Sequence, residues 1–131
     1  MKSRFEFIAR MQWSLERLTW IQAAGLAILL TAVIEGFCIL FRFGFGLDAT
    51  RDTCFLAPYT FGFRLHHGFI GVLLVMMMLP ARNAGWKRVL FIAGLGLVLS
   101  DAVHHFAILP VFTGSTHFDL TYAAMPKTGM F

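Results

Sequence analysis

Charged residues are scarce in this sequence, and cysteine is nearly absent. Asp, Glu, Lys and Arg together make up 14% of the chain, whereas soluble domains carry about 25%. The two cysteines, Cys38 and Cys54, are too few for a disulfide framework and form no CxxC pair. The sequence also has no glycine-rich phosphate loop, no GxSxG and no HExxH. It therefore lacks the signatures of P-loop nucleotide binding, serine hydrolysis and zinc proteolysis.

What the chain has instead is apolar sequence. Hydrophobic residues make up 58% of its 131 residues, and its mean hydropathy is +0.72. This composition is typical of an integral membrane protein. The length leaves room for three membrane-spanning helices and no separate soluble domain, so we expect an all-α integral membrane protein with a single membrane domain over residues 1–131.

The hydropathy pattern places the elements of this domain. Residues 3–17 mix apolar and charged side chains, which predicts a short amphipathic helix lying in the membrane interface. Three transmembrane helices are expected at about 18–43, 59–79 and 87–110, and residues 111–131 form a tail. No small-residue cleavage site follows a short apolar core, so no removable signal peptide is expected.

Basic residues flank the predicted spans on one side. They precede the first span and fill the loop between the second and third: Lys2, Arg4, Arg10, Arg17, Arg82, Lys87 and Arg88. The positive-inside rule then places the N-terminus in the cytoplasm and the tail outside, in the cytoplasmic (inner) membrane of a prokaryote. The positive charge suits lipid headgroups and not nucleic acid, because it forms no single patch.

Ionisable side chains inside the predicted spans are the most informative feature. Such groups are costly in a membrane and mark a functional site by default. All three spans contribute them: Glu35, His66, His67, Asp101, His104 and His105. Counted from the basic boundaries at about 1.5 Å per residue, they lie at depths of roughly 20 to 27 Å, in one layer in the outer third of the bilayer.

Imidazole and carboxylate groups from neighbouring helices are the usual ligands of iron, copper, zinc and manganese. The six residues therefore predict a transition-metal site. Adjacent histidines on a helix point about 100° apart, so one member of each pair is expected to face the metal directly. Hydrogen bonds or charge from four further residues would support the ligands: Arg64, Ser100, Thr31 and Cys38.

Several functions are compatible with these residues. A metal-dependent membrane oxidoreductase or a metal-bearing subunit of a membrane complex is the first. Haem b is an alternative, held by one histidine from each of the last two spans, with Gly68, Gly71, Gly94 or Gly96 opening space for the ring. An ion path, or an accessory protein whose polar residues only join helices, are the others. Because three helices bury little area, a homo-oligomer or a partner membrane subunit is expected.

Overall fold

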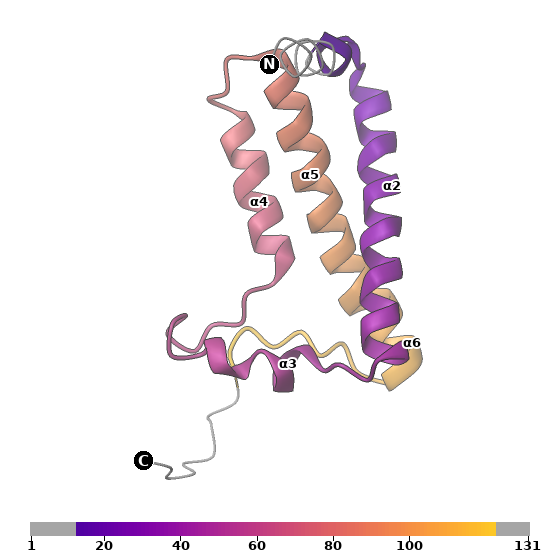
Figure 1. The fold of residues 1–131 in the computed structure, drawn as a ribbon, viewed down its shortest axis with the longest axis vertical. Helices are drawn as coiled ribbons and strands as arrows, with labels where there is room; N and C mark the ends of the chain where they lie inside the picture. The colour runs from indigo at the N-terminus through magenta and orange to yellow at the C-terminus, as the bar shows by residue number, and fades with distance from the viewer. Residues whose placement is uncertain (1–12, 123–131) are drawn as a thin grey trace, which may run out of the picture.

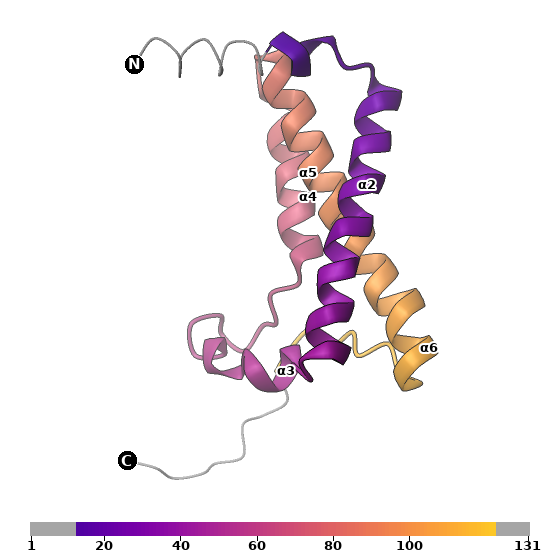
Figure 2. The ribbon, with the colours of Figure 1, turned by 45° about the vertical axis from the view of Figure 1, so that its right-hand side comes forward.

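The computed structural model describes residues 13–122 and contains three long helices in this range. They are α2 (Trp20–Ile39), α4 (His67–Met78) and α5 (Ala84–Val103). Helix α5 packs against both α2 and α4, and it runs antiparallel to α4 after a short turn (Figures 1 and 2). No strand occurs among these residues; a single bridge joins Phe63 to Thr121. The predicted all-helical class is confirmed, whereas the predicted interfacial helix is described only over its helical residues 13–17.

Two of the helices continue beyond their α-helical parts. Helix α2 runs into a π-helical segment, η1 (Leu40–Gly44), and α5 runs through a second one, η3 (His104–Ile108), into α6 (Leu109–Thr113). The continuous helices Trp20–Gly44 and Ala84–Thr113 have 25 and 30 residues and are apolar enough to cross a membrane. At about 1.5 Å per residue both exceed the ~30 Å of a hydrocarbon core.

Helix α4 is shorter than the span predicted over residues 59–79. It has 12 residues, about 18 Å of helix, which is less than a membrane requires. The preceding chain carries Pro58, and Phe61 and Gly62 have φ values of 53° and 81°, so it turns instead of forming a helix. Its backbone pairs with the tail, since Arg64 N–H donates to Leu120 O and Tyr122 N–H donates to Gly62 O.

The described parts of the two basic regions, Arg17 with its neighbours and the turn before α5, lie at the same end of the helices; Lys2, Arg4 and Arg10 lie outside the described residues. Asn83, which caps the first turn of α5 by accepting from Trp86 N–H, donates to Glu16 at 3.3 Å. Arg88 donates to Leu18 O at 2.8 Å and lies over the Trp20 ring. For the described residues, the chain before α2 and the turn before α5 therefore share one end of the bundle, and the buried polar residues lie toward the opposite end.

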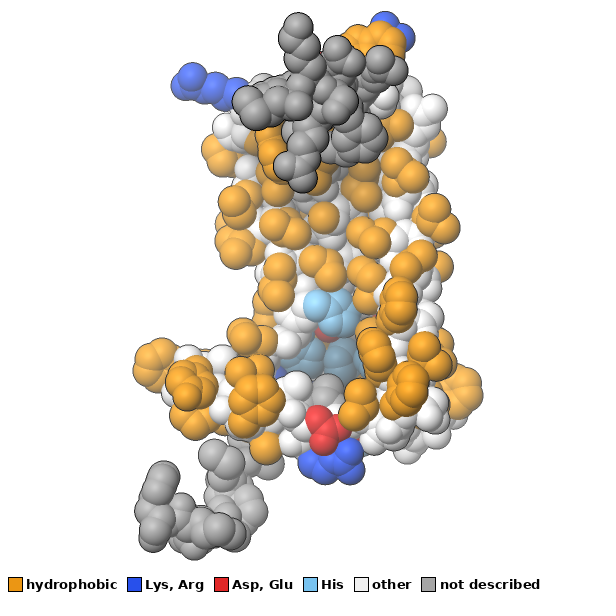
Figure 3. Space-filling view, viewed as in Figure 1, with side chains coloured by type: hydrophobic (Ala, Val, Ile, Leu, Met, Phe, Trp, Pro, Cys, Tyr) orange, Lys and Arg blue, Asp and Glu red, His pale blue; other side chains and the backbone are white. Residues whose placement is uncertain are grey.

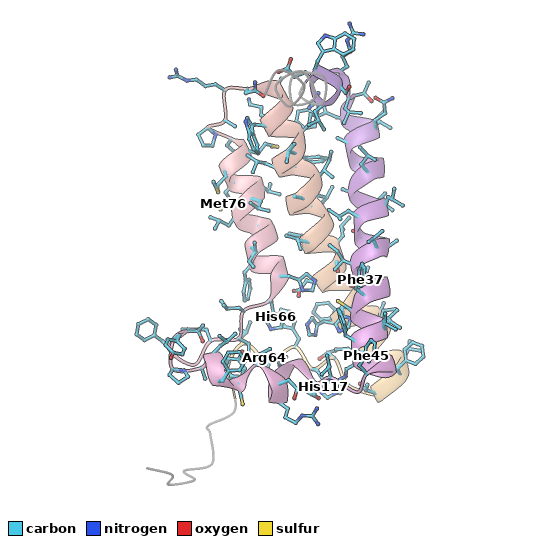
Figure 4. All side chains as sticks on the ribbon, in the orientation of Figure 1. Phe37, Phe45, Arg64, His66, Met76 and His117 are labelled. Atoms are coloured by element: carbon cyan, nitrogen blue, oxygen red, sulfur yellow. The ribbon has the colours of Figure 1, made fainter. Side chains whose placement is uncertain are left out.

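Apolar side chains cover the outside of the helices, and few lie inside. The buried apolar residues among those described are Ala23, Ala27, Ala57 and Leu109. Large side chains such as Ile21 and Leu73 are 86% and 57% exposed, and Figure 3 shows hydrophobic side chains along the visible length of the helices. Met76 also points outward from α4 (Figure 4). This distribution suits a lipid environment.

Glycines bring the helix backbones together. A Cβ at Gly71 would lie 2.6 Å from Gly94 O, and a Cβ at Gly94 would lie 2.8 Å from Gly71 O. Gly96 receives Leu30 of α2 in the same way, because a Cβ there would lie 2.9 Å from the Leu30 side chain. These glycines therefore allow close approach of the helices. The neighbouring helix occupies the space beside these glycines, so they leave no room for a haem ring.

We expect Gly71→Ala to destabilise the protein by about 1 to 3 kcal/mol, because its Cβ would force α4 away from α5. Unfolding in detergent, followed by circular dichroism, measures this loss. Gly25→Ala is the matched control, since no atom lies within 4 Å of its Cβ position, and there alanine is expected to leave stability unchanged or raise it by up to about 1 kcal/mol. Equal effects of the two substitutions would contradict the close contact.

Candidate metal centre

All six predicted ligand residues gather at the end of the bundle where α2 ends, α4 begins and α5 ends. A cavity of about 410 Å³ opens there between the helices and the loop after α2. Asp101 and all four histidines of the two pairs line it. Figure 3 shows histidine side chains on the floor of this hollow. The predicted convergence of polar groups from three helices is therefore seen in the fold.

Asp101 lies at the centre of the histidines. Its Oδ1 atom is 3.5 Å from His66 Nδ1, 3.6 Å from His67 Nδ1 and 3.9 Å from His105 Nε2. Asp101 is 7% exposed. Among the described residues, its Oδ1 is the one buried side-chain oxygen or nitrogen that has no hydrogen-bond partner. Leaving a buried carboxylate oxygen unpartnered is costly.

These distances are too long for hydrogen bonds, which join nitrogen and oxygen at about 2.7 to 3.2 Å. The two shorter distances, to His66 and His67, are close to the separation of two atoms that bind one ion, and the distance to His105 is longer. Ligands about 2.0 to 2.1 Å from a tetrahedral metal lie about 3.3 Å apart. The ligand atoms of His66, Asp101 and His105 all lie within 4.8 Å of one another, so a single ion between them would partner the Asp101 oxygen.

The tail fixes the protonation of two of the histidines. His66 Nε2 lies 3.0 Å from Asp119 O, and His105 Nδ1 lies 2.8 Å from Thr116 O. Because a backbone carbonyl only accepts, each of these nitrogens carries the hydrogen. In a neutral imidazole the other nitrogen then presents a lone pair. The two lone pairs belong to His66 Nδ1 and His105 Nε2, the atoms that face Asp101.

A chain of hydrogen bonds also fixes which ring nitrogen of His67 carries the hydrogen. Ser100 Oγ donates to Glu35 Oε1 at 2.6 Å and therefore accepts from His67 Nε2 at 3.2 Å. The lone pair of His67 is thus on Nδ1, again facing Asp101. Three imidazole lone pairs and a carboxylate oxygen converge, which is unfavourable without a cation and is the donor set of an imidazole-rich metal site.

The structure places Glu35 apart from this group. Glu35 accepts from Ser100 and from His104 Nδ1, the latter at 3.1 Å. The ligand atoms of Glu35, Cys38 and His104 lie within 4.8 Å of one another. Five of the six predicted ligands therefore fall into two neighbouring groups, and Cys38, predicted to support the ligands, lies in the second. His67 belongs to neither group and adjoins the first through Asp101, 3.6 Å away.

Both members of the first histidine pair, His66 and His67, face Asp101, contrary to the expectation of one direct ligand per pair. His66 is the extended residue that precedes α4, with φ −80° and ψ 138°, so it does not follow the helical 100° step and reaches Asp101 together with His67. His104 and His105 begin the π-helical segment η3. They divide between the two groups, one facing Glu35 and the other Asp101.

Two of the predicted supporting residues bind elsewhere. Thr31 Oγ1 donates to Ala27 O and Gly96 O and joins α2 to α5 without contacting the site. Arg64 is buried and directs Nη1 at the tail, not at Glu35 or Asp101. Of the predicted supporting residues, Ser100 holds the position expected of it.

Sequence reasoning missed the tail as part of the site. Residues 114–122 cross beneath the helices (Figure 1) and supply the carbonyls that hold His66 and His105. Phe118 packs against both imidazole rings, with centroids 4.7 and 5.2 Å away. Backbone carbonyls leave no mark in a sequence, so the residue types of this segment do not reveal its contribution to the site.

Comparison of the chain with protein-family models, with curated proteins and with solved structures gives no match. The function must therefore be argued from the geometry of the site.

We expect Ser100→Ala to weaken metal binding by about 10 to 100-fold, because it releases both His67 and Glu35. Competition with a chromophoric chelator measures the affinity. Thr31→Ala is the control, since it removes a buried hydroxyl that joins the same two helices outside the site. It should cost about 1 kcal/mol of stability and leave metal affinity unchanged. Equal loss of affinity in both variants would show that Ser100 acts through general stability.

Proposed function

We propose that this chain is an integral membrane protein that binds a transition metal, and that it works as a metal-dependent oxidoreductase or as a metal-bearing subunit of a membrane complex. The metal ligands are His66, His67, Asp101 and His105. Glu35, Cys38 and His104 form an adjoining set of donors for a second ion or for protons. When bound, the metal supplies Lewis-acid or redox chemistry at the inner end of the cavity.

One observation carries this proposal. The buried Oδ1 of Asp101 has no hydrogen-bond partner and faces three imidazole nitrogens. In each of these rings the hydrogen is on the other nitrogen, which donates it away from Asp101. Structural polar contacts would pair these atoms with each other, whereas here each histidine bonds outward and leaves its lone pair inward. The open cavity beside them leaves access for a further ligand, as catalytic metal sites require.

Haem b does not fit this arrangement. The rings of His66 and His105 are in contact, with centroids 4.9 Å apart, and no porphyrin can lie between them. Gly68, Gly71 and Gly94 were expected to open space for the ring. A Cβ added at any of them would lie within 3 Å of Asp101 or of the opposite helix, so this space is already filled. A non-haem ion is therefore the better candidate.

An ion path through one chain is also less well supported. The buried polar residues among those described are confined to one end of the bundle, and Thr31 is the furthest of them along α2. Beyond it, Ala23, Ala27, Gly94 and Gly96 fill the helix contacts. No line of polar side chains continues from the site through this described part of the bundle.

A membrane location agrees with the apolar surface and with two helices of spanning length. The basic regions share one end of the bundle, so the positive-inside rule would place that end in the cytoplasm and the metal centre near the outer surface. The exposed apolar faces of α2 and α4 would contact lipid, a second copy or a partner membrane subunit. α4 is too short to span alone and relies on such neighbours.

Elemental analysis tests the proposal directly. Protein purified in mild detergent without a metal-affinity column is expected to contain about one or two equivalents of iron, copper, zinc or manganese per chain. Asp101→Asn keeps the size of the side chain and removes its charge, so metal content should fall at least tenfold.

Asp119→Asn is the matched control for this experiment, because Asp119 holds His66 through its backbone carbonyl and its side chain is 66% exposed. Its metal content should equal that of the wild type. Full metal content in Asp101→Asn would overturn the proposed site and favour an accessory protein whose polar residues only join helices.

A further inference from the structure

Arg64 is a buried cation beside the metal centre whose hydrogen bonds are largely unused. Its side chain is 8% exposed, and it lines the same cavity as the histidines. Its Nη1 donates to His117 O at 3.2 Å and to Asp119 Oδ2 at 3.4 Å. Among the described residues, Nε and Nη2 of Arg64 have no hydrogen-bond partner, and neither is sealed from solvent.

Nearby carboxylates do not neutralise this guanidinium. Asp48 is paired with Arg42 at 2.6 Å. Asp52 is paired with Arg51 at 2.8 Å, and this bond holds the pKa of the Asp52 carboxyl below its usual range. Asp119, the one carboxylate that reaches Arg64, is exposed and at the limit of hydrogen-bond distance. A buried charge with so weak a partner is destabilising, and a further anion bound beside it would reduce this cost.

The unused edge of Arg64 has the shape that a carboxylate matches. The Nε–H and Nη2–H bonds of a guanidinium point in parallel from one side and bind both oxygens of a carboxylate at once. Figure 4 shows Arg64 beside His66, with His117 of the tail at the same end of the bundle. The donor edge and the metal ligands therefore share one cavity.

The charge of the cavity depends on the metal. Its charged lining consists of two arginines and three aspartates, Arg42, Arg64, Asp48, Asp52 and Asp101. With neutral histidines this gives a net charge of −1, which a divalent ion changes to +1. A bound divalent ion would thus make the cavity more favourable for an anion than it is without the metal.

We infer that the cavity binds a carboxylate ligand, with the carboxylate on the free edge of Arg64 and the rest of the molecule extending toward the metal centre. Apolar side chains of the lining would contact its body: Phe41, Leu47, Leu65 and Leu109. The role of the metal in this site rests on the proposed function. The ligand is either a small water-soluble carboxylate or the acid group of a lipid chain.

Isothermal titration of the full chain in lipid nanodiscs tests this site, with acetate, hexanoate and inorganic phosphate as probes and with the protein either loaded with Co²⁺ or stripped of metal. The loaded wild type should bind acetate and hexanoate, and Arg64→Gln should weaken both at least tenfold with the cobalt content unchanged. Arg64→Lys keeps the charge but loses the parallel donors, so it should also weaken binding. Arg82→Gln, an exposed arginine at the opposite end, should have no effect.

The outcomes separate the two proposals. If cobalt binds but Arg64→Gln retains wild-type carboxylate affinity, the carboxylate site is overturned and the metal site stands. If no cobalt binds but the stripped protein holds carboxylates through Arg64, the proposed function fails and the carboxylate site stands. Tighter binding of phosphate than of either carboxylate overturns it. Hexanoate binding more tightly than acetate supports a lipid acid, and equal affinities support a small soluble carboxylate.

Discussion

The position of one carboxylate, that of Asp101, determines how the rest of this structure is arranged. It is buried in a chain with few charges, and it reaches α4 because Gly68 has no side chain; a Cβ there would lie 2.6 Å from Asp101 Oδ2. Further along, Gly71 and Gly94 hold the two backbones close enough to keep this contact. His66, just before α4, and His67, its first residue, then reach the carboxylate, and η3 brings a third histidine.

The two long helices and the clustering of the ionisable residues could be predicted from sequence, because both leave strong signals. Apolar runs define α2 and α5, and ionisable residues inside such runs are rare enough to identify a site. The common end of the basic regions followed from the number of helices. The residues that support the ligands were harder to predict. Thr31 and Arg64 have side chains that could do so, but they donate hydrogen bonds to backbone carbonyls elsewhere.

Two features could not be predicted from sequence. The start of α4 at His67 depends on backbone pairing between residues 62–64 and the tail, which lies more than 50 residues away. That late start frees His66 from helical geometry and lets both histidines face Asp101. The division of the ligands into two groups depends on hydrogen bonds at Ser100 and Glu35 that no residue spacing encodes.

The dependence of His66 and His105 on the tail has a consequence for the biosynthesis of the protein. Every candidate metal ligand precedes residue 106, whereas the carbonyls that orient two of the histidines belong to residues 116 and 119. A ribosome makes these residues after the candidate ligands. A nascent chain that already holds all the candidate ligands therefore still lacks the carbonyls that orient two of them. The inward-facing arrangement of these imidazoles depends on the tail folding back under the helices.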